Sequence, residues 1–304
     1  MDNRALVTIG LPFYNCERTL LKALRSIYAQ TFQDWELILV DDGSHDASPD
    51  IAAAIDDPRV RVLSDGKNLG LVARLNQITQ LARGKYVCRM DGDDLSHPDR
   101  LATQLAHLEV NPDVDVLGTM AIAIDAQDRP SRLRTSDPDA LRERRTVLRR
   151  GGLLHPTVMA RAEWMRRFPY DPAFPRAEDQ ELWVRSCGLS RLDQLPLPLY
   201  FYRETDCLNL DNYRKSCASV RKIFRHHGPA LLSATAIATL VVRSHLKEAC
   251  YRALDATGQA SRLVKLRGTP LSEQQVAAAV KVIEAVLRTP VPTIGSKTKR
   301  HVAG

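Results

Sequence analysis

The first 124 residues alternate between short apolar runs and segments of helical periodicity, and no other feature of the chain limits its fold as strongly. In the segment at residues 17–30, for example, Leu20, Leu24 and Ile27 fall on one helical face. Strands and helices that alternate at this spacing favour a parallel sheet with right-handed crossovers, and therefore an α/β fold. Strands are predicted at residues 5–12, 35–42, 59–63, 85–91 and 114–124, and helices at 17–30, 71–84 and 97–111.

The remainder of the chain has a different character. An arginine-rich, helix-like stretch ends at Gly151-Gly152, and a further helix is predicted from Asp179 to Cys187. From about residue 212 onward only helical periodicity is present. A chain of 304 residues is long enough for one large domain with an appendage. We predict a main α/β domain over residues 1–210, a basic α-helical region over 211–290 and a disordered tail over 291–304.

The predicted α/β domain and the C-terminal region differ in net charge. The whole chain carries a net charge of +7, but residues 1–210 contribute −4 and residues 211–304 contribute +11. A basic region can meet nucleic acid, an anionic membrane surface or an acidic partner, and solvated helix faces explain it equally well. Because no aromatic residues are interleaved with the basic ones in a recognisable motif, we expect no nucleic-acid partner.

Composition and the N-terminal residues indicate a cytoplasmic protein. The chain is 44% apolar and 26% charged, as is usual for a soluble globular protein. It enters a predicted strand at once, without the basic and apolar segments of a signal peptide. The apolar run at residues 231–242 is shorter than the ~20 residues that span a bilayer. The six cysteines form no CxxC pair, which favours reduced thiols.

Three of the predicted strands end in polar clusters. Because ligands bind outside the carboxyl ends of the strands in an open parallel sheet, we expect the three clusters to share one binding edge. Taken alone, the second cluster would be interpreted as a turn followed by a helix cap. The convergence of all three is what indicates a site. The clusters are Pro12–Asn15, Asp41–Ser44 and Asp91–Asp94.

The Asp91-Gly92-Asp93 element suits a divalent metal. On an extended backbone the two aspartates would point to the same side of the chain, and Gly92 permits a close approach. Carboxylates that are held together repel one another unless a cation relieves them. Hard oxygen ligands suit Mg²⁺ or Mn²⁺. We therefore predict a Mn²⁺ or Mg²⁺ site at this element.

Residues 5–204 contain, in this order, the motifs VTIGLPFYN, LILVDDGSHD, NLG, KYVCRMDGDD and AEDQELWVR. In these motifs and their order the chain resembles the family 2 glycosyltransferases. This resemblance implies a GT-A fold, which is a Rossmann-like, mostly parallel sheet flanked by helices, here followed by the C-terminal helical region. It also implies a nucleotide-diphosphate-sugar donor, for which uridine is the usual nucleoside in the family, a divalent metal and transfer with inversion.

The resemblance implies roles for the residues of the first two clusters. Pro12, Tyr14 and Asn15 match the loop that lies against the nucleotide base, with Tyr14 as the candidate stacking ring. Either Asp41 or Asp42 would hydrogen-bond the edge of the base, and Asp42 is slightly favoured.

Further roles follow from the remaining motifs. Arg74 matches a position that often contacts the nucleotide. Asp91 would bind the ribose, and Asp93, together with Asp91, the metal that bridges the diphosphate. Asp179 matches the catalytic base, with Glu178 beside it.

These residue types fit the chemistry independently of the resemblance. An acceptor hydroxyl is a poor nucleophile at neutral pH, so a carboxylate that takes its proton accelerates transfer by ~10²–10⁴. A metal neutralises the charge of the leaving nucleoside diphosphate, so that one base and one metal suffice. Taken alone, Glu178 and Asp179 would be an acidic first turn of a helix. His155 lies where family members carry a polar residue near the acceptor, and it is a weaker candidate for the metal or a phosphate.

Three readings compete for the function. The favoured one is a glycosyltransferase that adds one sugar per encounter to cell-surface polysaccharide, lipopolysaccharide or a lipid-linked glycan, since the Gln-x-x-Arg-Trp element of processive synthases is absent. A sugar nucleotidyltransferase would need a glycine-rich basic loop after the first strand, where this chain has LPFYNCERT. A non-catalytic glycan-binding protein would not need intact Asp93 and Asp179. A lipid-linked acceptor would fit contact between the basic region and an anionic membrane.

Overall fold

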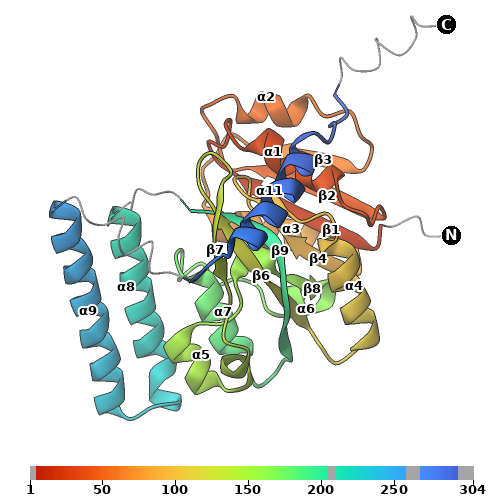
Figure 1. Cartoon of the computed structure of the whole chain (residues 1–304). Helices are drawn as coiled ribbons and strands as arrows, with labels where there is room; N and C mark the ends of the chain where they lie inside the picture. Colours follow the sequence, from red (N-terminus) through yellow and green to blue (C-terminus); the bar gives the residue numbers. More distant parts are fainter. Residues whose placement is uncertain (1–4, 205–209, 258–267, 294–304) are drawn as a thin grey trace, which may run out of the picture.

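The computed structural model describes residues 5–204, 210–257 and 268–293 (Figure 1). Its strands are β1 (Val7–Phe13), β2 (Trp35–Asp41), β3 (Val60–Ser64), β4 (Tyr86–Arg89), β5 (Leu95–Ser96), β6 (Val116–Ile124), β7 (Pro130–Arg134), β8 (Met159–Arg161), β9 (Leu192–Arg203) and β10 (Thr269–Pro270). Its α-helices are α1 (Leu20–Tyr28), α2 (Ser48–Ala53), α3 (Leu71–Leu81), α4 (Arg100–Val110), α5 (Arg144–Arg150), α6 (Ala162–Arg167), α7 (Glu178–Ser186), α8 (Leu210–His227), α9 (Ala234–Ala256) and α11 (Glu273–Leu287). Every strand and helix predicted within the first 124 residues is present, with ends that differ by a few residues.

The strands form one mixed sheet in the order β10-β7-β6-β8-β4-β1-β2-β3, with β9 beside β6 and β5 beside β9. The predicted parallel pairing holds for β1 with β2 and β4, and for β2 with β3. Beyond β4 the sheet becomes mixed, because β8 runs antiparallel to both β4 and β6. The sequence did not predict β8, since a strand of three residues is too short to carry a periodic signal.

The two faces of the sheet are covered by different helices. The alternate residues Val7, Ile9, Leu11 and Phe13 of β1 pack into an apolar cluster with α1 and α4. On the other face α3 packs closely on β1, because a Cβ at Gly10 would lie 2.4 Å from the Ile78 side chain. A second cluster fills the space among α3, α5, α6 and α7. This layered arrangement confirms the predicted α/β fold.

The C-terminal helices take two separate positions (Figure 1). Helices α8 and α9 pack on one another and project from the body beside α5 and α7. Strand β10 pairs with β7, and α11 contacts α1 and β7. The boundaries proposed at residues 210 and 290 stay predictions, and residues 294–304 of the expected tail lie outside the described residues. No helix in the described part of the chain is both long enough and apolar enough to span a bilayer.

Candidate functional site

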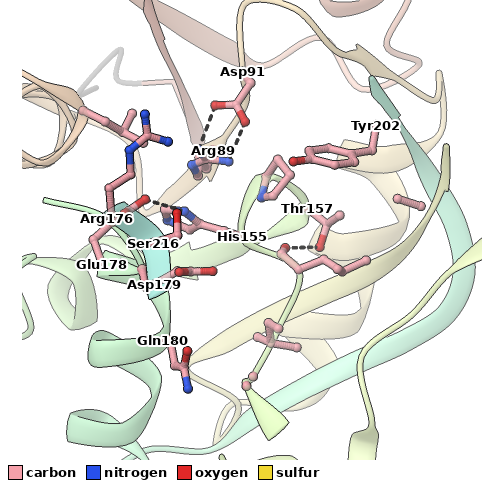
Figure 2. Close-up of a pocket in the computed structure, with 18 of the residues that line it drawn as sticks. Arg89, Asp91, His155, Thr157, Arg176, Glu178, Asp179, Gln180, Tyr202 and Ser216 are labelled. Atoms are coloured by element: carbon pink, nitrogen blue, oxygen red, sulfur yellow. Dashed lines mark hydrogen bonds and ion pairs between the residues drawn. The ribbon is translucent and has the colours of Figure 1, made fainter. Parts of the chain in front are cut away.

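A cavity of about 900 Å³ opens at the carboxyl ends of β1 and β4. One wall carries Tyr14, Asp91 and Asp93 from the ends of these strands. The opposite wall carries Glu178 and Asp179 from the start of α7 (Figure 2). A volume of this size is in the range of small-molecule and cofactor sites. The structure therefore brings residues that lie almost 90 positions apart in the sequence into one cavity.

The acidic element is a tight turn and not the extended segment that the sequence argument assumed. The amide of Asp94 donates to the carbonyl of Asp91 at 3.4 Å, which closes the turn over Gly92 and Asp93. Ligand atoms of Asp91, Asp93 and Asp94 lie within 4.8 Å of one another. Gly92 sits close to β1, since a Cβ there would lie 3.1 Å from the Phe13 Cβ. The turn thus brings three carboxylates together. On an extended backbone, only Asp91 and Asp93 would have pointed to the same side.

Arg203, at the end of β9, holds this turn in place. Its backbone amide donates to Asp94 Oδ1 at 2.6 Å, and its Nε donates to the carbonyl of Asp93 at 2.6 Å. Its guanidinium also reaches Asp128 Oδ1 at 2.5 Å. Because these contacts come from a strand more than 100 residues further along the chain, the shape of the turn depends on tertiary packing.

The acidic turn has the chemistry that a divalent cation needs. The Oδ2 atom of Asp94 is buried and has no hydrogen-bond partner among the described residues. Burial, followed by repulsion from Asp93 and Asp91, holds the pKa of the Asp94 carboxyl well above its usual range. Although the Asp93 side chain is exposed to the cavity, desolvation by the surrounding protein and the neighbouring Asp91 raise the pKa of its carboxyl to about 6. A cation would relieve both effects, so the residues present fit a hard divalent metal.

Arg89 lies at the floor of the cavity and contacts the same cluster (Figure 2). Its Nη1 and Nη2 atoms lie 3.0 Å and 2.8 Å from the two carboxylate oxygens of Asp91. The guanidinium is only 5% exposed, and its Nε has no hydrogen-bond partner among the described residues. Sequence reasoning missed Arg89, although a lone arginine inside the apolar strand KYVCRM was a signal for a buried functional charge.

The start of α7 presents the two acids of the opposite wall. Ala177, just before the helix, has a left-handed backbone with φ of 56°. Glu178 is buried, whereas the Asp179 side chain is partly open to the cavity. Burial raises the pKa of both carboxyls, and the neighbouring Glu178 raises that of Asp179 further. A partly open carboxylate with a raised pKa is suited to accept a proton.

His155 packs against Glu178 and not against the acidic turn. Its Nδ1 lies 3.5 Å from Glu178 Oε1, and its Nε2 lies 2.7 Å from the hydroxyl of Tyr170. Burial, reinforced by the positive charge of Arg89, lowers the pKa of His155 to about 3. The ring is therefore neutral at physiological pH, and it does not belong to the group of carboxylates that could hold a metal.

The loop after β1 places one aromatic ring in the cavity. Tyr14 is 44% exposed and lines the cavity, while Pro12 is buried within β1. Asn15 has φ of 50° and joins the loops after β1 and β2, because its Oδ1 accepts from the amide of His45 at 2.9 Å and its amide donates to Ser44 Oγ at 3.0 Å. The first two strand-end clusters are thus tied together as expected.

Asp41, Asp42 and Arg74 lie behind this edge and do not line the cavity. Asp41 accepts from the amide of Ser44 and from the hydroxyl of Ser64. The Arg74 Nε donates to Asp42 Oδ1 at 2.9 Å, and the rest of its guanidinium is hydrogen-bonded to the loop before α3 and to Gln77 within α3. Both Asp42 and Arg74 thus hold the loop before α3, and their expected contacts with a nucleotide stay predictions.

Other residues of the cavity wall also carry polar groups. Arg176 lies just before α7, and the partly buried Tyr202 lies on β9 beside Arg203 (Figure 2). The pairing of β9 with β5 and β6 brings Tyr202 and Arg203 to the acidic turn. By contrast Trp164 and Trp183 stack in the core, with ring centroids 6.3 Å apart.

Comparison with known sequences identifies relatives of this chain. The family model described as Glycosyl transferase family 2 matches residues 8–171. The putative glycosyltransferase EpsE of Bacillus subtilis (strain 168) is 36% identical over 193 residues, which are 61% of this chain and 68% of EpsE. The putative colanic acid biosynthesis glycosyl transferase WcaA of Escherichia coli (strain K12) is 35% identical over 109 residues, which are 35% of this chain and 39% of WcaA.

Solved structures share the fold. The structure of Staphylococcus aureus TarS 1–349 in complex with UDP-GlcNAc superposes with a TM-score of 0.56 at 18% identity, covering 93% of this chain and 81% of TarS 1–349. The mannosyltransferase PcManGT from Pyrobaculum calidifontis, in complex with GDP-Man and Mn²⁺, gives a TM-score of 0.55 at 18% identity, covering 93% and 85%.

Proposed function

Because the chain belongs to glycosyl transferase family 2, we propose that it transfers a single sugar, with inversion, from a nucleotide-diphosphate donor to an acceptor hydroxyl. The observation that carries this proposal is the single cavity in which the acidic turn at Asp91–Asp94 faces the carboxylate of Asp179. A donor bound at the acidic turn and an acceptor bound at Asp179 would meet inside this cavity. The proposed catalytic domain comprises residues 1–210.

The donor side is proposed to follow the strand-end clusters. Tyr14 offers an exposed ring for the nucleotide base, and Asp41 or Asp42 is proposed to hydrogen-bond its edge. Asp91 is proposed to bind the ribose. A UDP-sugar is favoured, in keeping with the UDP-GlcNAc bound by TarS, although PcManGT binds GDP-Man.

Asp93 and Asp91 are the residues that would hold Mn²⁺ or Mg²⁺, and the buried free oxygen of Asp94 lies beside them. Such a cation neutralises the negative charge that grows on the leaving nucleoside diphosphate. Arg89 orients Asp91, since both of its terminal nitrogens contact that carboxylate. The Mn²⁺ in the PcManGT complex supports the choice of a divalent metal.

Asp179 is the proposed general base that takes the proton from the acceptor hydroxyl. Its raised pKa strengthens it as a proton acceptor, and it is open to the cavity. Behind it, Glu178 lies 3.5 Å from the ring of His155, and His155 is hydrogen-bonded to the hydroxyl of Tyr170. These contacts are proposed to hold the start of α7 in position. No separate protein acid is needed, because the leaving diphosphate is already a weak base.

The acceptor is proposed to be a glycan under construction for the cell surface, either as polysaccharide, as lipopolysaccharide or on a lipid carrier. Two relatives support this direction by their descriptions, WcaA in colanic acid biosynthesis and the succinoglycan biosynthesis protein ExoO of Rhizobium meliloti (strain 1021). This part of the proposal concerns the whole enzyme, because the matched segments span only 39% of WcaA and 27% of ExoO.

We place the enzyme in the cytoplasm, with peripheral contact to the anionic inner face of the membrane. Residues 211–304 carry a balance of +11, and α9 exposes Val242 and Leu246 to the extent of 55% and 61%. Flotation with vesicles that contain anionic lipid tests this placement. We expect the wild-type chain to float and a Val242→Ser/Leu246→Ser variant to float less. Equal recovery with purely zwitterionic vesicles would contradict an anionic surface as the partner.

A panel of nucleotide-sugars tests the catalytic proposal. Each donor is titrated into the purified chain with Mn²⁺ and again with EDTA, and slow hydrolysis of the donor is followed in parallel. We expect one uridine-based donor to bind more tightly with Mn²⁺ than with EDTA and to be hydrolysed slowly. Binding of no nucleotide-sugar under either condition would overturn the proposed function.

A further inference from the structure

A second cavity, of about 490 Å³, lies between α5, the start of α7 and the projecting pair of helices α8 and α9. It adjoins the catalytic cavity, because Gly151, Gln180 and Ser216 line both. Gln180 directly follows the proposed base Asp179 in α7. A molecule that occupies the second cavity therefore lies next to the place where the acceptor hydroxyl must sit.

The rim of the second cavity is strongly basic. It carries Arg149 and Arg150 from α5, and Arg243 and Lys247 from successive turns of α9. No aspartate or glutamate is among its lining residues. Arg150 is paired with Asp137, whereas the other three cations take part in no ion pair within the described parts of the chain. Three cations without a carboxylate partner favour an anionic ligand with more than one charge.

The interior of the same cavity is apolar. Phe224 and Cys217 of α8 are 6% and 8% exposed, and Val220 and Leu240 complete the wall from α8 and α9. A free phosphate would leave this apolar wall without a contact, and a purely apolar ligand would leave the cations without a contact. The combination fits a molecule with an anionic head and an apolar chain.

We infer that this cavity binds the lipid phosphate that carries the acceptor, with the phosphate groups at Arg149, Arg243 and Lys247 and the first carbons of the chain against Phe224 and Leu240. This inference rests on the proposed function, and it selects a lipid-linked acceptor from the glycans named there. The sugar attached to the phosphate would extend past Gln180 toward Asp179. The exposed Val242 and Leu246 on α9 would keep the rest of the chain close to a membrane.

Farnesyl diphosphate is a probe that combines both chemical features in a water-soluble molecule. It is titrated calorimetrically into the full chain in EDTA, so that the diphosphate cannot bind through a metal, with inorganic diphosphate and farnesol as separate ligands. We expect farnesyl diphosphate to bind at least tenfold more tightly than either, because only it contacts both the cations and the apolar wall. If farnesyl diphosphate and inorganic diphosphate bind with equal affinity, the apolar wall does not contribute to binding. The cavity would then be a site for free phosphates, and the inference would be overturned.

A pair of matched variants locates the binding. Arg243→Ala/Lys247→Ala removes two exposed cations of the rim, and Arg252→Ala/Lys281→Ala removes two exposed cations elsewhere. We expect the first variant to bind farnesyl diphosphate at least tenfold more weakly and the second to bind like the wild type. If both variants bind equally, the ligand is not in this cavity.

The donor titration separates this inference from the proposed function. Both variants should keep the Mn²⁺-dependent affinity for the nucleotide-sugar, since neither changes the catalytic cavity. If the donor binds but farnesyl diphosphate does not, the inference about the second cavity fails while the proposed function stands. If the donor does not bind the wild-type chain, the proposed function itself fails.

Discussion

The guanidinium of Arg89 lies against both carboxylate oxygens of Asp91, with distances of 3.0 Å from Nη1 to Oδ2 and 2.8 Å from Nη2 to Oδ1. The pair sits at the floor of a cavity whose other acids are Asp93, Glu178 and Asp179. A buried cation at this point offsets the repulsion among the carboxylates. Burial lowers the pKa of His155, and the positive charge of Arg89 reinforces that shift.

Replacing Arg89 by methionine is expected to weaken metal-dependent donor binding about tenfold at pH 6.5. Without the guanidinium the pKa of Asp93 rises further, since Arg89 now lowers it, and more of the carboxylate is protonated at that pH. Raising the pH to 8.5 should restore most of the affinity, because the carboxylate is then ionised again. Arg89→Lys keeps the charge and should lose less. A loss that is the same at both pH values would mean that Arg89 acts only through packing.

Asp179→Asn is expected to lower turnover by ~10²–10⁴ while the donor affinity changes by less than threefold, because an amide cannot take the proton of the acceptor. Steady-state rates and a separate donor titration measure the two effects. Glu178→Gln is the comparison, since Glu178 contacts His155 and is buried. Glu178→Gln should reduce turnover by a smaller factor. A larger loss of turnover than in Asp179→Asn would mean that Glu178 is the base and Asp179 the supporting residue.

The rate of transfer should fall on the acid side at a higher pH than an ordinary aspartate would give. Burial, together with Glu178, raises the pKa of Asp179, and the base is active only when it is ionised. Activity is therefore present above the raised pKa and lost as the pH falls through it. The profile is measured for kcat at saturating donor and Mn²⁺, so that protonation of Asp93 does not contribute. A rate that stays constant down to pH 4 would exclude Asp179 as the base.

Asp93→Ala is expected to reduce the Mn²⁺-dependent affinity for the donor by at least tenfold, as loss of a metal-site residue typically does. Binding in EDTA should change little. Asp99→Ala is the matched control, because Asp99 is an exposed acid six residues further on, outside the group of candidate metal ligands. Equal effects of the two substitutions would show that general negative charge, and not a metal ligand, is what matters.

Glu181→Gln tests the packing contact between α7 and α8. Burial alone would raise the pKa of Glu181, but contacts with His227 and Arg185 outweigh it, so the pKa is lowered. The substitution should reduce the free energy of unfolding by about 1–3 kcal/mol at pH 7, less than for a fully buried pair because Arg185 is partly exposed.

The pH dependence of this effect has a definite sign. A carboxyl with a lowered pKa stabilises the fold above its unfolded pKa, and the contribution is lost as the pH falls through the folded value. Urea unfolding at pH 7 and pH 3.5 should therefore show a smaller difference between wild type and variant at the lower pH. Glu163→Gln, at an exposed position in α6, should be neutral at both.

The sequence by itself determined the elements of the first 124 residues and the edge of the sheet at which the polar clusters meet. Apolar periodicity is a local property, because each side chain faces the core or solvent according to its position in its own helix or strand. The same holds for the strand-end clusters at Tyr14 and Asp91, whose common edge follows from parallel pairing alone.

The tertiary structure decided what these clusters do. It replaced the expected extended segment by a turn that Arg203 holds, bound Arg74 to Asp42 behind the cavity, and placed Arg89 beneath Asp91. It also set α8 and α9 beside α5, which creates the second cavity. Each of these contacts depends on how the whole chain packs. The sequence pattern of a single helix or strand does not predict such contacts, because the same pattern is compatible with different neighbouring elements.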